Sequence, residues 1–498
     1  MRFFTYIAST HMDTGSQNQR LAQVIILIFT TGVFFFGHLQ IATAQTVHIP
    51  DPGLRAVIES ALNKQAGEDI TQADMADLEV LQGKCRYSRQ QQSWWWQDQW
   101  MCESTNNTEF VIRDLTGLEF AFNLKELYLA RNRVSDVSPL KNLTSLIHLA
   151  LENNRVSDVS SLKDLTNLTH LSFRNNNRIS DVSPLRNMTK LTYLDLNSNQ
   201  VSDVSPLKDL TNLAYLHLAQ NKVSDVSPLR NMTKLIYLDL ESNQVSDVSP
   251  LRNMTKLTYL DLDSSQISDV SPLKDLTNLT VLDVSDGLVS DVSPLRNMTK
   301  LINLDIDDNQ ISDMSALKNI TNLQHLDIHG NQISDASALR GMRKLIKLDF
   351  DDNQILDISP LKALTNLRNL DLDGNQILDV SPLKALTNLR NLDLDGNRIL
   401  DVSSLKALTN LTVLDLHDNQ ILDISPLKAL TNLTELDLDD NEISDISPLS
   451  ALIDLMVLDL DGNKVLNVSP LSTLINLTEL DLHDNEIIDV SPLSSLVN

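Results

Sequence analysis

Aspartate recurs at multiples of 22 residues along much of this 498-residue chain, and clustered carboxylates are the ligands that hard cations prefer. We call the thirteen residues at this position the aspartate column: Asp195, Asp239, Asp261, Asp283, Asp305, Asp327, Asp349, Asp371, Asp393, Asp415, Asp437, Asp459 and Asp481. A second acid follows two residues later at Asp263, Asp307, Asp351, Asp373, Asp395, Asp439 and Asp461. The sequence offers Asp371, Asp373, Asp393 and Asp395 as calcium candidates. We prefer a solvated acidic face that was copied with the repeat, and therefore assign no metal ligand and no cofactor.

Four tyrosines lie two residues before this column position in successive copies of the repeat. They form the tyrosine strip: Tyr193, Tyr215, Tyr237 and Tyr259. We expect their rings to be exposed beside Asp195, His217, Asp239 and Asp261, and to supply the rigid, amphipathic contact area that protein interfaces favour. Duplication of one residue without selection for binding explains the same pattern, and both interpretations stay open.

Histidines offer a weaker metal hypothesis. His325, Asp327 and His329 alternate along one predicted strand, and two of them could chelate zinc with Asp305 or Asp349. His325 and His329 would be about 13 Å apart on an extended strand, too far for one ion. We prefer a solvated pair of histidines. His148, His170 and His417 are expected to be dispersed.

Catalytic signals are absent from the sequence. No nucleophile is paired with a base, and there is no glycine-rich phosphate loop or convincing metal-ligand cluster. The many carboxylates repeat one position and do not form a distinct acid and base. We therefore expect that the chain is not an enzyme.

A polar, glutamine-rich segment at 83–111 interrupts the repeat pattern. It contains both cysteines of the chain, Cys85 and Cys102, which we expect to form a disulfide in an exported protein. It also holds every tryptophan: Trp94, Trp95, Trp96 and Trp100. These rings could pack over the edge of the N-terminal cap, which we favour, or grip a carbohydrate ring or a protein pocket.

Seventeen copies of a 22-residue repeat, each beginning with leucine, run from Leu124 to the end of the chain. A period of this length is typical of leucine-rich repeats. In the copy that begins at Leu367, Leu370 and Leu372 alternate with polar residues, which predicts a short strand of a parallel sheet on the concave face. Proline at Pro382 and its equivalents predicts a 3₁₀ or extended convex face. The predicted fold class is therefore α/β, a leucine-rich repeat solenoid.

The N-terminal region predicts export and a cap. The apolar run at 21–36 and the Ala-Thr-Ala sequence that ends at Ala44 indicate a signal peptide over 1–44, with Met1 or Met12 as the start. Asp51 before Pro52 and Thr71 before Asp74 predict two helices in a small cap at 45–82. A half repeat and the seventeen copies then occupy 112–498. The mature chain is expected to be secreted or held at the cell surface, with no membrane segment after cleavage.

The net charge of −26 argues against nucleic acid as a partner. A protein ligand with a basic surface fits this charge better, and carbohydrate is an option at the tryptophan segment. We expect a curved monomer.

Copies such as ISDISPLSALIDLMVLDLDGN from Ile443, together with the export signal and the helical cap, resemble bacterial internalin-type leucine-rich repeat proteins. The resemblance spans about 47–498 without the tryptophan segment. It implies a right-handed horseshoe and protein binding on the concave face. Surface-anchored members carry an immunoglobulin-like domain and anchoring modules that do not follow the repeats here, so attachment to a host receptor is not implied, and a truncated member is one explanation.

Our leading functional hypothesis is a non-catalytic, exported protein-recognition module. A calcium-dependent structural or adhesive protein of the cell envelope is the alternative. An extracellular enzyme, or a regulator of one, ranks third.

Overall fold

The computed structural model divides the chain into residues 1–44 and 45–498. It describes residues 45–496 apart from 84, 93–94, 103–110 and 177. The predicted signal peptide and Trp94 therefore lie outside the described residues. Among the described residues, none of the helices combines the length and the apolar character needed to cross a bilayer.

Two short α-helices form the N-terminal end of the described part, and both begin where the capping residues predict. Helix α1 spans Pro52–Ala61, and the Asp51 carboxylate accepts a hydrogen bond from the Leu54 amide. Helix α2 spans Gln72–Ala76. Thr71 and Asp74 form a complete capping box there, although aspartate replaces the usual glutamate.

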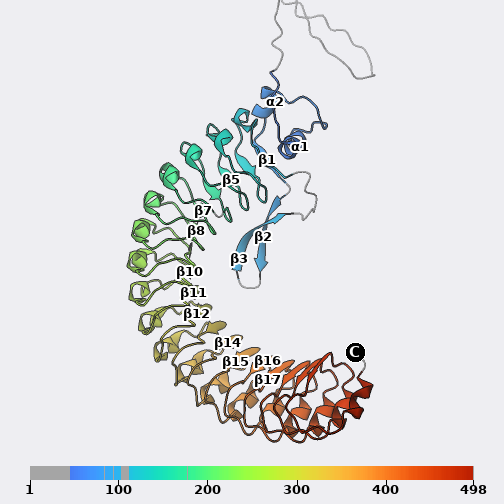
Figure 1. The fold of residues 1–498 in the computed structure, drawn as a ribbon. Coiled ribbons are helices and arrows are strands. Elements are labelled where there is room, and N and C mark those ends of the chain that lie inside the picture. The colour runs from blue at the N-terminus through green and yellow to red at the C-terminus, as the bar shows by residue number, and fades with distance from the viewer. Residues whose placement is uncertain (1–44, 84, 93–94, 103–110, 177, 497–498) are drawn as a thin grey trace, which may run out of the picture. The chain divides into compact units, whose positions relative to one another are not determined.

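The repeats together form one parallel sheet, to which each copy contributes a three-residue strand. Within the described residues it has 18 strands, and each strand pairs in register with the equivalent strand of the next copy. Figure 1 shows these strands on the inner side of the curved array. The strands are β1 (Val80–Gln82), β4 (Glu126–Tyr128), β5 (His148–Ala150), β6 (His170–Ser172), β7 (Tyr193–Asp195), β8 (Tyr215–His217), β9 (Tyr237–Asp239), β10 (Tyr259–Asp261), β11 (Val281–Asp283), β12 (Asn303–Asp305), β13 (His325–Asp327), β14 (Lys347–Asp349), β15 (Asn369–Asp371), β16 (Asn391–Asp393), β17 (Val413–Asp415), β18 (Glu435–Asp437), β19 (Val457–Asp459) and β20 (Glu479–Asp481).

The outer side is built from 3₁₀ helices, as the prolines predict. In a typical copy, the Ser381 amide and hydroxyl donate to the two oxygens of Asp379, and Ser381 and Pro382 are the first two residues of the helix. The 3₁₀ helices are Leu118–Phe120, Ser138–Leu140, Ser160–Leu162, Ser183–Asn187, Ser205–Leu207, Ser227–Asn231, Ser249–Asn253, Ser271–Leu273, Ser293–Asn297, Ser315–Asn319, Ser337–Gly341, Ser359–Ala363, Ser381–Ala385, Leu405–Ala407, Ser425–Ala429, Ser447–Ala451, Ser469–Thr473 and Ser491–Ser495.

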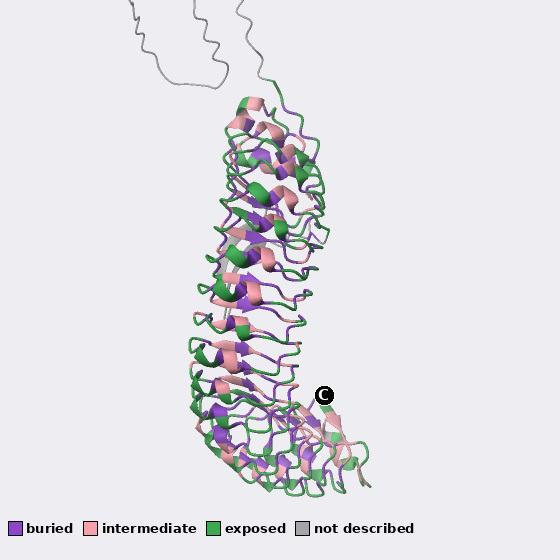
Figure 2. Ribbon diagram, turned by 90° about the vertical axis from the view of Figure 1, so that its left-hand side faces the viewer, coloured by how far each residue is buried: buried purple, intermediate pink, exposed green. Residues whose placement is uncertain are grey.

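The core is one continuous column of aliphatic side chains between the two sides. Leu370 lies in strand β15 and Leu372 directly follows it, and both are almost fully buried. Ile377, Val380 and Leu383 of the same copy are buried to the same extent. Figure 2 shows such buried segments recurring along the stack. Because each copy buries its apolar face only against its neighbours, the stack acts as one domain.

Asparagine at the ninth position of the repeats forms a second continuous element, the asparagine ladder. The buried Asn375 donates from Nδ2 to the carbonyls of Phe350, Leu372 and Asp373 at 2.9, 3.1 and 2.9 Å. Its Oδ1 accepts from the Ile355 amide at 2.9 Å. One side chain therefore satisfies backbone groups of its own copy and of the copy before it. Ser265 and Gly287 replace asparagine at this position in two consecutive copies.

The tryptophan-rich segment contains an antiparallel hairpin. Strand β2 (Cys85–Gln92) pairs with β3 (Trp95–Cys102), and the backbone register places Cys85 opposite Cys102. This register suits a covalent link across the open end of the hairpin. The disulfide itself stays a prediction.

Candidate functional site

The candidate site is the inner face of the sheet, formed by the third, fifth and seventh residues of each copy. In-register pairing places equivalent side chains side by side, so Tyr237 lies next to Tyr259 and Asp239 next to Asp261. Neighbouring parallel strands are about 4.8 Å apart. A residue type that recurs at one position therefore becomes a continuous row.

The tyrosine strip forms such a row. Ring centroids are 6.2 Å apart for Tyr193 and Tyr215, 6.4 Å for Tyr215 and Tyr237, and 4.0 Å for Tyr237 and Tyr259, whose planes lie within 9° of parallel. The structure corrects our expectation that all four rings are exposed. Only Tyr215 is exposed, at 38% of its surface, and stacking half-buries the other three rings.

The aromatic row also extends further than we expected. His148 and His170 are not dispersed, since their rings are 4.4 Å apart and His170 stacks on Tyr193 at 5.9 Å. Tyr128 contacts His148, and its hydroxyl hydrogen-bonds to Nδ1 of that ring at 2.9 Å. The signal was present in the sequence, because His148 and His170 occupy the same third position as the tyrosines.

His217 widens the row at the fifth position. Its ring lies 4.4 Å from Tyr237 and 5.2 Å from Tyr193. Asp195, Asp239 and Asp261, which we expected beside the rings, expose only 4%, 6% and 9% of their surface. They lie two residues along the strands from the third position, on the same face as the rings, and offer little contact area of their own.

Burial changes the protonation of these acids. Burial, followed by the charge of Asp239, raises the pKa of Asp261 to about 7. Burial likewise raises the pKa of Asp239 to about 6, although a hydrogen bond from Asn197 opposes the change. The Tyr259 hydroxyl donates to Asp261 at 2.8 Å, and burial raises the pKa of that hydroxyl well above its ordinary value.

Several acids in the later part of the aspartate column are also affected by burial, so this part is not simply a solvated face. Burial, followed by the charge of a neighbouring aspartate, raises the pKa of Asp283 and of Asp371 to about 7. Burial raises the pKa of Asp393 and of Asp415 to about 6. The acids are half-buried in the sheet, and their register sets like charges one strand apart.

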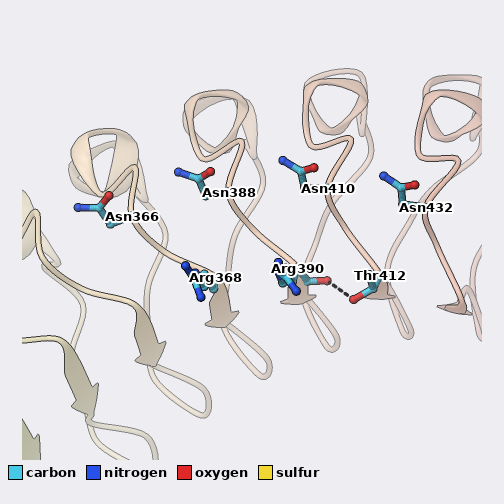
Figure 3. A pocket seen from close by; sticks show the side chains of 7 residues that line it. All are labelled: Asn366, Arg368, Asn388, Arg390, Asn410, Thr412 and Asn432. Atoms are coloured by element: carbon cyan, nitrogen blue, oxygen red, sulfur yellow. Dashed lines mark hydrogen bonds between the residues drawn. The ribbon is translucent and has the colours of Figure 1, made fainter. Parts of the chain in front are cut away.

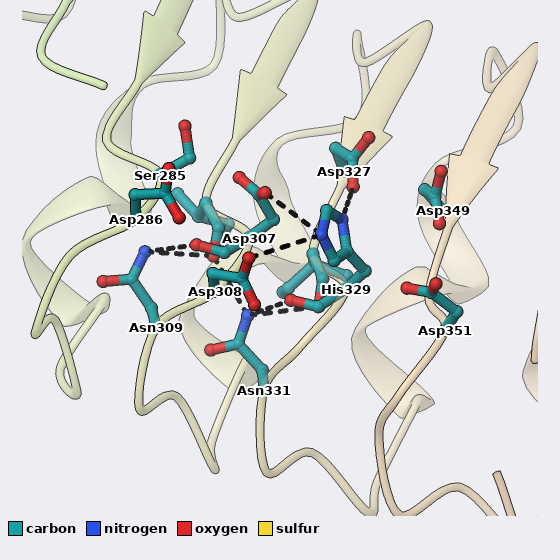
Figure 4. A network of polar contacts seen from close by, with 12 residues as sticks. Ser285, Asp286, Asp307, Asp308, Asn309, Asp327, His329, Asn331, Asp349 and Asp351 are labelled. Atoms are coloured by element: carbon teal, nitrogen blue, oxygen red, sulfur yellow. Dashed lines mark hydrogen bonds and ion pairs between the residues drawn. The ribbon is translucent and has the colours of Figure 1, made fainter. Parts of the chain in front are cut away.

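His329 stands at the centre of a charged network in this part (Figure 4). Its Nδ1 lies 2.8 Å from Asp327, and its Nε2 lies 3.2 Å from Asp307 and 3.8 Å from Asp308. Burial opposes protonation, but the Asp327 hydrogen bond and the surrounding carboxylates raise the pKa of His329 to about 9. The histidine is therefore a cation that offsets part of the acidic charge, and the picture of a solvated histidine pair does not hold for it.

The other histidines of this face differ from one another. His417 is also tied to acids, with Nδ1 2.9 Å from Asp439 and Nε2 3.9 Å from Asp395. Burial lowers the pKa of His325, with a smaller contribution from Lys347. His325 belongs to none of the groups of possible metal ligands among the described residues.

Two of those groups are relevant to cation binding. One donor atom each from Asp327, His329 and Asp349 lies within 4.8 Å of the others, and so do atoms of Asp349, Asp351 and Asp371. Of the four calcium candidates from the sequence, only Asp371 belongs to such a group. Asp373, Asp393 and Asp395 belong to none within the described part of the chain.

The other predicted binding residues lie on the hairpin. Trp95, Trp96 and Trp100 are in strand β3, with Trp96 and Trp100 at positions opposite Gln91 and Tyr87. Their role in binding stays a prediction.

Sequence reasoning missed a groove elsewhere on the array, which we call the arginine groove. It has a volume of about 500 Å³. Its lining comes from four copies: Asn366, Arg368, Asn388, Arg390, Asn410, Thr412 and Asn432. The signal was the pair of arginines at the second position of consecutive copies.

Comparison with known proteins places the chain in a family. The family described as Leucine Rich repeats (2 copies) matches residues 123–164, 166–209, 211–253 and 255–297, and matches in overlapping pairs from 299 to 451. The crystal structure of the internalin InlF from Listeria monocytogenes is 30% identical, covers 82% of this chain and 95% of its own, and has a TM-score of 0.51. This chain is an internalin-type leucine-rich repeat protein. No curated protein sequence matches it.

Other structures share the fold of this internalin-type protein. The leucine-rich repeat protein LIC12759 of Leptospira interrogans has a TM-score of 0.65 at 20% identity and covers 82% of this chain and 97% of its own. The plant peptide hormone receptor RGFR1 in complex with RGF2 has a TM-score of 0.63 at 22% identity and covers 76% of this chain and 75% of its own. The predicted solenoid, with strands on one side and 3₁₀ helices on the other, is confirmed.

Proposed function

We propose that this protein is a non-catalytic, exported recognition protein that binds a protein ligand on the inner face of its sheet. The observation that carries the proposal is the continuous aromatic row from Tyr128 to Tyr259. Stacked rings that are already ordered lose little conformational entropy on binding, and aromatic residues dominate the energetics of many interfaces.

The polar surroundings of the row suit a partner with basic groups. Asp195, Asp239 and Asp261 lie beside the rings on the same strands, and the chain as a whole carries a charge of −26. Lysine or arginine side chains of a partner would lie over the ring faces, where the aromatic quadrupole and the neighbouring acids both attract a cation. Internalin and receptor relatives that share the fold make protein recognition the expected use of such a face.

The test compares two double variants in capture from surface extracts of candidate cells. Tyr193→Ser/Tyr215→Ser removes two rings from the row, including the most exposed one. Asn369→Ser/Asn391→Ser is the matched control, because it changes the same strand position in later copies. We expect one partner, identified by mass spectrometry, to be retained by the wild type and the control and to be lost by the tyrosine variant.

The same variants then decide between binding and folding. Circular dichroism and the thermal midpoint should match the wild type for both. A purified partner that binds the folded tyrosine variant with unchanged affinity would place the interface elsewhere.

A calcium-dependent structural or adhesive role is the second candidate. One carboxylate oxygen each of Asp351, Asp395 and Asp439 is buried and accepts no hydrogen bond within the described residues. A cation could satisfy oxygens of this kind. If it does, millimolar calcium raises the thermal midpoint of the wild type more than magnesium does, and Asp351→Asn reduces the difference.

The hairpin proposals are tested separately. We propose a disulfide between Cys85 and Cys102, which a mass shift of two hydrogens on reduction of the exported protein would detect. Carbohydrate binding at Trp95, Trp96 and Trp100 predicts a change in tryptophan fluorescence on adding neutral oligosaccharides.

A further inference from the structure

The arginine groove lies where each convex segment runs into its strand (Figure 3). It belongs to later copies than the aromatic row. One wall holds Arg368, Arg390 and Thr412 at the starts of three successive strands. The other wall holds Asn366, Asn388, Asn410 and Asn432, the last residues of four successive copies. Its volume of about 500 Å³ falls in the range of small-molecule sites and exceeds that of one inorganic anion.

The two arginines form a local cationic pair in an acidic chain. Backbone pairing fixes them side by side, since the Arg390 amide donates to the Arg368 carbonyl at 2.8 Å. Both side chains are exposed, and neither guanidinium makes an ion pair or hydrogen bond among the described residues. By contrast, arginines on the convex side, such as Arg230 and Arg252, donate from Nε to serine carbonyls of their own 3₁₀ helices.

The asparagines supply oriented acceptors on the opposite wall. Asn388 donates from Nδ2 to the Thr365 carbonyl at 2.7 Å, and Asn410 donates to the Thr387 carbonyl at 2.8 Å. These bonds fix the amides and leave Oδ1 free of hydrogen bonds within the described residues.

The free oxygens are particular to this stretch of the array. In earlier copies the equivalent oxygens accept from a lysine of the next copy, as Asn212 accepts from Lys234 and Asn322 accepts from Lys344. After Asn366, Asn388 and Asn410 the next copy carries another asparagine in place of the lysine, and after Asn432 it carries Asp454, so the oxygens form a row without lysines.

We propose that the arginine groove binds a short acidic carbohydrate. The paired guanidinium groups suit a carboxylate or sulfate group, because they offer several N–H donors in a planar fork. The row of amide oxygens suits the donor hydroxyl groups on the other edge of a sugar. An acidic peptide satisfies the first wall but brings no series of hydroxyl groups for the second.

The chain's charge sets the length of the ligand. A long polyanion would extend from the groove across a protein of charge −26 and be repelled, whereas a short saccharide meets only the two arginines at close range. The site therefore favours a terminal or short acidic sugar over a long sulfated polymer.

Isothermal titration calorimetry of residues 45–498 tests the proposal with four probes at low and physiological salt. The probes are a sulfated tetrasaccharide, a uronic-acid tetrasaccharide of the same length, a neutral tetrasaccharide and an acidic tetrapeptide. The first two distinguish sulfate from carboxylate as the acidic group. We expect at least one of them to bind and the neutral saccharide and the peptide to bind at least tenfold more weakly.

Variants then place the binding. Arg368→Gln/Arg390→Gln should weaken the charged saccharide at least tenfold. Arg230→Gln/Arg252→Gln is the matched control, because it removes the same charge from adjacent copies on the convex side and should leave the affinity unchanged. Equal weakening by the two variants, equal binding of the peptide, or no binding of either acidic saccharide to the folded wild type would overturn the proposal.

Discussion

Asp261 provides a sharp test of the electrostatics of the inner face. It is 9% exposed and lies between Asp239 and Asp283 on the neighbouring strands. Its two oxygens accept separate hydrogen bonds, one from the Tyr259 hydroxyl at 2.8 Å and one from the Asp263 amide at 3.2 Å. An asparagine would keep the Asp263 bond through Oδ1 and place Nδ2 where it donates to the Tyr259 hydroxyl oxygen. The variant Asp261→Asn removes the charge with little change of shape.

The magnitude follows from the pKa of Asp261, which burial and Asp239 raise to about 7. An aspartate in an unfolded chain has a pKa of about 3.9, and each unit of difference corresponds to about 1.4 kcal/mol. The folded state therefore binds this proton more tightly, and the stability falls as pH rises from about 4, the unfolded pKa, to about 7, the folded pKa. Ionised Asp261 costs up to about 4 kcal/mol at pH 8, and since its neighbours share the repulsion we expect Asp261→Asn to gain about 2–4 kcal/mol.

Urea denaturation followed by circular dichroism measures this gain at pH 8, 5 and 4. The gain should shrink to about 1–2 kcal/mol at pH 5 and vanish near pH 4, where the unfolded chain also binds the proton. Asp269→Asn is the control, because Asp269 is exposed in the same copy and accepts from Ser271, so its loss should not stabilise. A variant no more stable than the wild type at pH 8, or a gain independent of pH, would refute the reasoning.

Two further substitutions probe the other rows. His329→Gln should lower the free energy of unfolding by about 1 kcal/mol at pH 6, after allowance for solvent screening. Because folding raises the pKa of His329 to about 9, its contribution is complete below about pH 6.5 and is lost as pH rises through 9. Thermal midpoints across pH 6–10 should therefore show a difference between variant and wild type that disappears above pH 9. Asn375→Ala should lower the free energy of unfolding, measured by urea denaturation, by about 3 kcal/mol, because several buried backbone groups lose their partner. Gln376→Ala is the control, because Gln376 is exposed and its loss should change the stability little.

Much of the fold follows from the repeat itself. A 22-residue period, alternating leucines and a recurrent proline predict one strand and one 3₁₀ segment per copy, and every copy forms the same unit. The tyrosine strip was predictable for the same reason, since parallel register converts a sequence column into a row of neighbours.

Side-chain environment could not be read from the same columns. Whether Asp261 is solvated or buried depends on neighbouring side chains such as Tyr259, whose hydroxyl donates to it, and the pairing of His329 with Asp308 depends on the turn that follows the strand. The arginine groove joins the second position of one copy to the last position of others, so it exists only once the copies are stacked.

The asparagine ladder has a mechanical consequence. In other copies an amide such as that of Asn243 or Asn309 hydrogen-bonds to the backbone of the preceding copy. Ser265 and Gly287 lack this amide, so the bonds are missing at two consecutive copies. The gap coincides with the end of the aromatic row at Tyr259. The stability of a repeat array is approximately a sum over the contacts between neighbouring copies, so a force applied to its two ends should separate it first at the copies that carry Ser265 and Gly287. The aromatic half and the acidic half would then behave as two stiff segments joined by a weaker joint.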